Sequence, residues 1–564
     1  MSTFDRSDIG LGVSTHLLIG VTGHRDVRAD DEHLLAERLR TIFCELQTRF
    51  SSTPILLLSS LAEGADRLAA RVAYDVGVDV CVVLPMPLEY FRLDFADAAS
   101  TEEFELLYNR ATGHILLPLS DGEQIESLAD TMAREQQYIK ASLYLARYSH
   151  ILIAFWDGFE NPAPGGTYYA VRARLIGSDE FRSSASDPLD DAEVGMLYHI
   201  LTPRRCSPSP NGIAGTLAVK YPPTHTAHHY DEILVMLDEY NRDVQQWYAE
   251  HWQPNRCAIH ELYPHANTES PALERFCRQL FAADSVAVLY QHRTRRAFIG
   301  LFTLVFAAAT VFDIYAHLHH WTGKYGLIGY LLFFVIALFW YWTAQRRRYQ
   351  SKYLDYRAVT EGMRVQLHWH IAGVERMVGE HYLRKQKSEL DWIRYALNAA
   401  TIELNSRGSE HIGGSMMHRL ELSYRQWVES QKNYFARTHI SELLRLERLD
   451  RWIERSFGAA FVLAIIQLFV PDTYAIIIPM GLLPVVAGLL VGYIEKLGLH
   501  GHVKSSEYMA SLFHRAERRI AAVLARGDHH TAKNLLFELG KEALGENGDW
   551  LLYHRERQLE VPKG

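Results

Sequence analysis

Three short stretches of the sequence place glycines and polar side chains directly after apolar runs. They are GHRD at 23–26, SSLAEGAD at 59–66 and WDGFENPAPGGT at 156–167. Glycine lets the backbone approach a ligand closely, and the N–H groups at the start of a helix attract anions. His24 and Arg25 could add a hydrogen-bond donor and a fixed positive charge, both suited to phosphate. The pattern predicts a binding site for a phosphate-bearing ligand such as a nucleotide.

Acidic side chains in the same stretches suit another part of a nucleotide. Glu63 and Asp66 are unsuited to phosphate, but they could accept hydrogen bonds from ribose hydroxyls or an exocyclic amine. Each stretch taken alone is equally well explained as an ordinary loop, whereas three together favour a ligand site. The predicted ligand-binding residues are Gly23, His24, Arg25, Ser59, Ser60, Glu63, Gly64, Asp66, Asp157, Gly165, Gly166 and Thr167.

Short apolar strands alternate with amphipathic helices through this part of the chain. Strands are predicted at 16–23, 54–60, 79–85 and 150–158, with a further strand within 195–205. This alternation is typical of a doubly wound, Rossmann-like α/β fold with a parallel sheet covered on both faces. Ligands in such folds bind outside the carboxyl ends of the strands, which is where the three polar stretches fall.

Four long apolar segments follow in the second half, at 297–312, 325–344, 456–471 and 474–494. A membrane helix needs roughly 20 apolar residues. Soluble helices normally carry a polar stripe, so a membrane location is favoured over two hairpins buried in a soluble core. The sequence therefore predicts an all-α membrane region with two transmembrane hairpins and additional cytoplasmic helices.

Basic residues flank the two hairpins on one side. They cluster at 293–296, 346–348 and 448–455, while the short turns carry only Lys324 and Asp472. The positive-inside rule places both termini and the region between the hairpins in the cytoplasm. We expect a multi-pass protein of the inner membrane. The N-terminus lacks a basic region followed by an apolar one, so no cleavable signal peptide is expected.

Composition limits the remaining possibilities. The net charge of −9 argues against direct DNA binding, because such domains are usually basic. The five cysteines show no CxxC pair, which predicts reduced thiols and no metal site. Asp313 is acidic within an apolar segment, and histidines at 317, 319 and 320 follow it. An intramembrane functional carboxylate or a metal site is possible there, but a solvated, interfacial group is favoured.

The front of the chain resembles the SLOG superfamily over roughly residues 14–205. VTGHR, SSLAEGADRLAA and VCVVLP carry the resemblance. The superfamily includes the Rossmann-like domain of DNA-processing protein A and the "lonely guy" phosphoribohydrolases. PGGT at 164–167 is similar to half of the hydrolase motif PGGxGTxxE, but Ala170 stands where that motif has its catalytic Glu. The resemblance implies a sensor of a nucleotide-derived signal, with no catalytic residue, rather than a hydrolase.

The phrase YLDYRAVTEGMRVQLHW at 353–369 resembles the SLATT group of membrane hairpins. Members of that group often accompany SLOG domains, and they are proposed to form pores or perturb membranes in bacterial conflict systems. Arg357, Glu361 and Arg364 have the i+4 and i+3 spacing of helical ion pairs, and Tyr356 lies beside them. A gating role and simple helix packing are both open for these four residues.

Together these features predict a membrane effector with a cytoplasmic sensor. The expected parts are a sensor at 1–230, a helical connector at 231–296, a first transmembrane hairpin at 297–344, a cytoplasmic stalk at 345–455, a second hairpin at 456–494 and C-terminal cytoplasmic helices at 495–564. The sensor would bind a nucleotide-derived signal and control a pore in antiphage defence. Hairpins this short need several subunits to form a pore, so a homo-oligomer in the lipid bilayer is expected. The alternatives are a membrane-anchored phosphoribohydrolase-like enzyme using Glu63, Asp66 or Asp157, and a constitutive membrane protein with a vestigial ligand domain.

Overall fold

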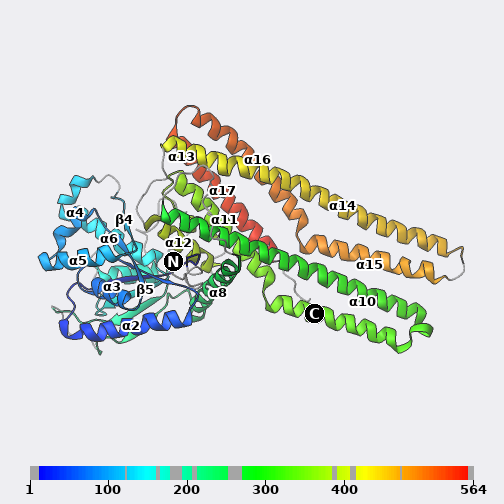
Figure 1. Cartoon of the computed structure of the whole chain (residues 1–564), viewed down its shortest axis with the longest axis horizontal. Helices are drawn as coiled ribbons and strands as arrows, with labels where there is room; N and C mark the ends of the chain where they lie inside the picture. Colours follow the sequence, from blue (N-terminus) through cyan, green and yellow to red (C-terminus); the bar gives the residue numbers. More distant parts are fainter. Residues whose placement is uncertain are drawn as a thin grey trace, which may run out of the picture. The chain divides into compact units, whose positions relative to one another are not determined.

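The computed structural model describes residues 12–120, 124–160, 165–177, 193–205, 212–251, 270–383, 390–406, 415–470 and 473–556. The chain forms two compact units (Figure 1). The first comprises Met1–Ala282 and Arg376–Gly413, and the second comprises Ala283–Glu375 and Gly414–Gly564.

A seven-stranded sheet forms the centre of the first unit, with strand order β4-β3-β2-β1-β5-β6-β7. Every neighbouring pair from β4 to β6 is parallel, and β7 runs antiparallel to β6. The strands are β1 (Leu17–Gly23), β2 (Ile55–Ser59), β3 (Asp79–Leu84), β4 (Gly113–Leu116), β5 (Ile151–Trp156), β6 (Leu197–Leu201) and β7 (Leu217–Lys220). The predicted parallel-sheet α/β domain is therefore confirmed.

Helices cover both faces of this sheet, because its central strands are apolar on both sides. One core joins side chains of α6, α7 and α12 to one face of the sheet, and another joins α3 and α5 to the opposite face (Figure 1). The helices of the first unit are α2 (Glu32–Arg49), α3 (Ala65–Asp75), α4 (Leu88–Phe91), α5 (Ala98–Arg110), α6 (Thr131–Tyr148), α7 (Thr167–Ile176), α8 (Ala227–His251) and α12 (Asp391–Ser406), with 3-10 turns at 29–31, 92–94, 125–129 and 378–380.

Helix α12 lies in the first unit, although the sequence predicted a separate stalk at 345–455. Ala399 and Ile402 are fully buried in the same core as Leu18 of β1. Trp392 packs against Tyr240 of α8, with ring centroids 5.5 Å apart. The apolar face of α12 is thus buried against the sheet unit instead of being shared among stalk helices.

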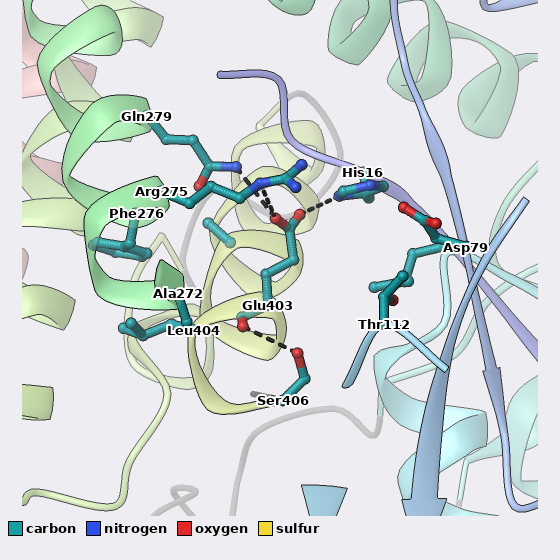
Figure 2. Close-up of a pocket in the computed structure, with 12 residues that line it drawn as sticks. His16, Asp79, Thr112, Ala272, Arg275, Phe276, Gln279, Glu403, Leu404 and Ser406 are labelled. Carbon is teal, nitrogen blue, oxygen red and sulfur yellow. Dashed lines mark hydrogen bonds and ion pairs between the residues drawn. The ribbon is translucent and has the colours of Figure 1, made fainter. Parts of the chain in front are cut away.

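A closed polar cluster lies at the amino ends of the strands. His16, directly before β1, forms an ion pair with Glu403 of α12 (Figure 2). The second carboxylate oxygen of Glu403 lies 3.0 Å from Arg275 Nε and 3.4 Å from Gln279 Nε2, both in the first turns of α10. The adjoining cavity, about 20 Å³, has room for roughly one water molecule. We call His16, Arg275, Gln279 and Glu403 the Glu403 cluster.

The second unit is built from long helices (Figure 1). Most of α10 belongs to it, although the first turns of α10 lie in the first unit. The helices are α10 (Pro271–Arg346), α11 (Tyr349–Ile371), α13 (Met416–Ser423), α14 (Ser430–Gln467), α15 (Tyr474–Lys496), α16 (Leu499–Leu524) and α17 (His529–Arg555), with a π-helical turn at Tyr424–Glu429. The predicted all-helical region after the sheet domain is confirmed.

Three helices in the described residues are long and apolar enough to cross a membrane. They are Pro271–Leu318, Thr322–Ile371 and Tyr474–Lys496. Helix α10 bends between the first two, where Leu318 and Gly323 leave helical geometry. The two arms pack together, and Trp340 Nε1 donates a hydrogen bond to the Ala297 carbonyl at 3.1 Å. The end of α14, predicted as a further span, is not among the three.

Candidate ligand-binding cleft

An open cleft of about 890 Å³ lies where the strand order of the sheet reverses. Strands β2, β3 and β4 extend from one side of β1, and β5 and β6 extend from the other. Ligands of open α/β sheets bind at this kind of switch point, outside the carboxyl ends of the strands. Nine of the twelve predicted residues line the cleft, namely Gly23, His24, Arg25, Ser60, Asp66, Asp157, Gly165, Gly166 and Thr167.

The other three predicted residues support the cleft from behind. The buried Ser59 hydroxyl accepts a hydrogen bond from the Leu61 N–H at 3.1 Å. Glu63 accepts hydrogen bonds from the Ala96 N–H at 2.9 Å and from the Ser100 hydroxyl, so its carboxylate is committed to the start of α5. Gly64 has a φ of 82°, which favours glycine. None of the three lines the cleft.

His24 is held in the cleft as a neutral side chain. Its Nε2 lies 3.1 Å from the backbone N–H of Asp157 and accepts its hydrogen bond. Burial lowers the pKa of His24, although the charge of nearby Asp157 acts in the opposite direction. The same nitrogen, Nε2, lies 3.4 Å from Asp157 Oδ1, so His24 and Asp157 are held together in the cleft. Burial favours the uncharged form of His24, which therefore brings no fixed positive charge to a ligand.

Asp66 is a buried carboxyl group in the wall of the cleft, with 6% of its surface exposed. Burial raises the pKa of Asp66 to about 7, even though Arg25 and the backbone N–H groups of Ala62 and Ser60 favour its charged form. The group is therefore poised between its protonated and charged forms near neutral pH. It can accept or donate a hydrogen bond, and it has the pKa of a general acid or base.

Arg25 supplies a positive charge to the cleft. Its guanidinium group lies 5.1 Å from the centre of the Tyr138 ring, and the residue is exposed. Among the described residues no carboxylate forms an ion pair with Arg25, whereas Arg204 is held by Asp26 at 2.9 Å. Arg25 is thus available to an incoming anion.

The start of α7 forms the opposite wall. Gly165 has a φ of 73°, and its carbonyl accepts a hydrogen bond from the Ser142 hydroxyl of α6 at 3.0 Å. Helix α7 begins at Thr167, and the first N–H groups of a helix have no acceptor within the helix itself. These donors and Arg25 border the same cleft. The wall thus combines a helix N-terminus with a side-chain cation, which suits an anion. Pro164 of the PGGT motif lies outside the described residues.

Several lining residues were missed by the sequence argument. Trp156 and Tyr168 stack with ring centroids 5.8 Å apart, at the end of β5 and the start of α7. Trp156 lies near the end of the strand predicted at 150–158, so its place at the carboxyl edge could have been deduced. The same holds for Arg204, which follows β6. Tyr138, in contrast, comes from the interior of α6, and the sequence pattern gave no signal for it.

The four helix-packing or gating candidates lie together on α11 in the second unit. Glu361 forms ion pairs with Arg357 at 2.7 Å and with Arg364 at 2.6 Å. Arg364 also lies 3.3 Å from Asp284 of α10, and the buried Tyr356 ring packs edge-on against Tyr290, 5.5 Å away. These contacts join α11 to α10.

No group of three or more His, Cys, Asp or Glu side chains is placed to hold a metal ion in the part of the chain that the structure describes. No protein-family model matches the chain, and no curated protein matches it significantly.

Proposed function

We propose that the cleft binds a nucleotide-derived anion and that its occupancy controls a membrane-permeabilising helical module. The observation that carries this proposal is the meeting of Arg25, the α7 N-terminus and an aromatic pair in one cleft at the sheet's switch point. Resemblance of the front to SLOG domains and of 353–369 to SLATT hairpins supports the same function, in bacterial antiphage signalling.

Each part of a nucleotide has matching groups in the cleft. A phosphate would bind between Arg25 and the first N–H groups of α7, where a fixed charge and oriented donors coincide. A base would lie against the Trp156 and Tyr168 rings, because aromatic faces stack on bases of any sequence. Ribose hydroxyls would donate hydrogen bonds to Asp66 or Asp157.

The membrane module would consist of two hairpins in the inner membrane. The three apolar helices supply three spans, and the end of α14 at 456–467 would supply the fourth. Basic flanks place both termini in the cytoplasm by the positive-inside rule. Hairpins of this size form a pore by assembling several subunits. A ligand can shift this assembly only by binding one of its states more tightly than the other.

Dye uptake by bacteria producing the full-length protein tests this function. Inducing the wild-type chain while supplying or depleting candidate nucleotides should change dye entry. Arg25→Ala should make dye entry independent of nucleotide, since it removes the cleft's cation. Arg172→Ala is the matched control, because Arg172 is an exposed residue of α7 that does not line the cleft. Equal dye entry under all conditions would defeat the proposal.

A second candidate function, nucleotide hydrolysis, is favoured by one observation. Asp66 is a cleft carboxyl group whose pKa is raised to about 7 by burial, as general acids and bases often are. Ala170, at the position of the hydrolase motif's Glu, counts against it. Release of free base from nucleoside monophosphates by the full-length protein, abolished in Asp66→Asn, would establish the enzyme instead of the sensor.

A further inference from the structure

Asp313 lies inside the first apolar helix of the second unit. It is the only acidic residue between 297 and 318, and this stretch contains no Lys or Arg. The residue lies about one and a half turns before the bend at Leu318. Its side chain is 18% exposed. An ionisable group at such a position is costly in a membrane and usually marks an ion or proton pathway.

The carboxylate of Asp313 faces helix α15. A Cβ atom placed on Gly481 would lie 3.2 Å from Asp313 Oδ1, so the absence of a side chain there lets the carboxylate approach the α15 backbone. Eleven residues away on each helix, a Cβ on Gly492 would lie 3.6 Å from the Phe302 ring. These two contacts run in opposite order along the two helices, so α10 and α15 pack antiparallel through glycine positions.

Helix α15 contains a proline on either side of this contact. Pro479 and Pro484 lie inside the helix. Proline has no N–H, so Pro484 cannot bond the carbonyl of Met480, four residues earlier. That carbonyl belongs to the residue preceding Gly481. In membrane proteins, backbone carbonyl oxygens that lack a helical hydrogen bond can coordinate cations.

The carboxylate itself lacks a full set of partners. Asp313 Oδ2 is buried and has no hydrogen-bond partner among the described residues. Asp313 Oδ1 lies 3.4 Å from His317 Nδ1, but that nitrogen also lies 2.9 Å from the Asp313 backbone carbonyl. A buried polar atom without a partner is unfavourable, so this site has capacity for a bound cation.

We propose that Asp313 and the proline-flanked segment of α15 around Gly481 form a binding site for a monovalent metal cation, Na⁺ or K⁺. The ligands would be the Asp313 carboxylate and backbone carbonyl oxygens of α15, the hard oxygen donors that such ions require. In an oligomeric pore these carboxylates would form a ring, and rings of Asp make pores cation-selective. The selectivity role rests on the proposed pore function, but the binding site does not.

Cation-dependent stability of the full-length protein tests the site without requiring a pore. The melting temperature of each protein is measured in KCl, NaCl and choline chloride at equal ionic strength. K⁺ or Na⁺ should raise the wild-type melting temperature relative to choline, because binding to the folded state stabilises it. Asp313→Asn should abolish the difference and Asp313→Glu should retain it. Thr310→Val is the matched control, since Thr310 bonds its own helix at the Phe306 carbonyl.

Permeability of proteoliposomes to K⁺ and Cl⁻ tests the role in selectivity. The wild type should prefer K⁺, and Asp313→Asn should reduce that preference, as expected for loss of a fixed charge. A cation-dependent shift of the melting temperature without any ion permeability would support the cation site and contradict the proposed pore. Absence of a metal-dependent shift in the wild type, a shift unchanged in Asp313→Asn, or a response to pH alone would overturn the cation site.

Discussion

The two ends of strand β1 carry histidines in opposite situations. At the amino end, His16 belongs to the Glu403 cluster, where one carboxylate is met by a histidine, an arginine and an amide (Figure 2). At the carboxyl end, His24 lines an open cleft together with Arg25 and Asp66. In the first arrangement the Glu403 carboxylate faces Arg275 and His16 within the fold, whereas the second leaves charge and donors facing solvent.

The pKa values of the carboxyl groups at the two ends of β1 are shifted in opposite directions. Burial acts to raise the pKa of Glu403, but the neighbouring His16 and Arg275 lower it overall. Burial raises the pKa of Asp66 to about 7, and the charges around it are too few to reverse this. The charges at the amino end therefore stabilise the fold, whereas the buried carboxyl group at the carboxyl end costs stability, as expected if that end binds the proposed ligand.

Removing the charge of Glu403 should give the largest effect. Glu403→Gln leaves the buried His16 without its carboxylate partner and Arg275, which is 21% exposed, without its counter-charge, which should lower the free energy of unfolding by about 3–5 kcal/mol. Thermal or denaturant melting of the detergent-solubilised full-length protein measures the loss. Glu102→Gln, at an exposed position of α5, should stay near wild type. An unchanged melting point in Glu403→Gln would remove the distinction between the two ends.

The open end depends on close packing of α3 against the end of β1. In Gly64→Ala the new Cβ would lie 2.4 Å from the Arg25 carbonyl oxygen, at a φ of 82°. We expect a loss of roughly 2–4 kcal/mol from strain and overpacking together. Gly77→Ala is the control for backbone strain alone. Gly77 has a similar φ of 72°, but a Cβ atom added there would have no neighbour within 4 Å. Equal losses in both variants would show that packing at Gly64 is unimportant.

Asp66→Asn should stabilise the protein near neutral pH. In the folded state Asp66 keeps its proton up to about pH 7, whereas its ordinary pKa is 3.8. Wild-type stability should therefore fall as pH rises through this window and level off above it. The variant lacks this dependence, so its advantage should grow by about 2 kcal/mol between roughly pH 5 and pH 8. Melting curves across this range measure it, and a constant difference would contradict the raised pKa.

The Glu403 cluster predicts a pH dependence of stability with the opposite sign. Stabilisation from a carboxyl group with a lowered pKa is present above its ordinary value and is lost as pH falls through the folded-state value. The melting temperature of the wild type should therefore fall as the solution is made acidic, and the melting temperature of Glu403→Gln should fall less.

Arg25→Ala should have the smallest effect on stability and a clear effect on binding. Arg25 is exposed, so the melting point should move little. Loss of one charged hydrogen bond should weaken binding of a nucleoside monophosphate about tenfold. Titration calorimetry with the full-length protein measures this. Unaltered affinity would show that the phosphate binds elsewhere.

The residues of the cleft at the carboxyl end of β1 could be predicted from the sequence, whereas the Glu403 cluster at its amino end could not. Parallel strands align their carboxyl ends, so polar residues directly after β1, β2 and β5 could be placed at one edge from local pattern alone. The Glu403 cluster joins positions 16, 275, 279 and 403, and no local signal links residues so far apart. Glu63 shows the limit even at the open end, because its partner Ser100 lies on a different helix.

Identification of the small molecule that co-purifies with the full-length protein tests the central claim most directly. Mass spectrometry of the gently purified wild type should find a phosphate-bearing, nucleotide-derived compound. The compound should be depleted in Arg25→Ala and retained in Arg172→Ala. A cleft that yields no such compound from the wild type, or the same amount from all three proteins, would contradict the account.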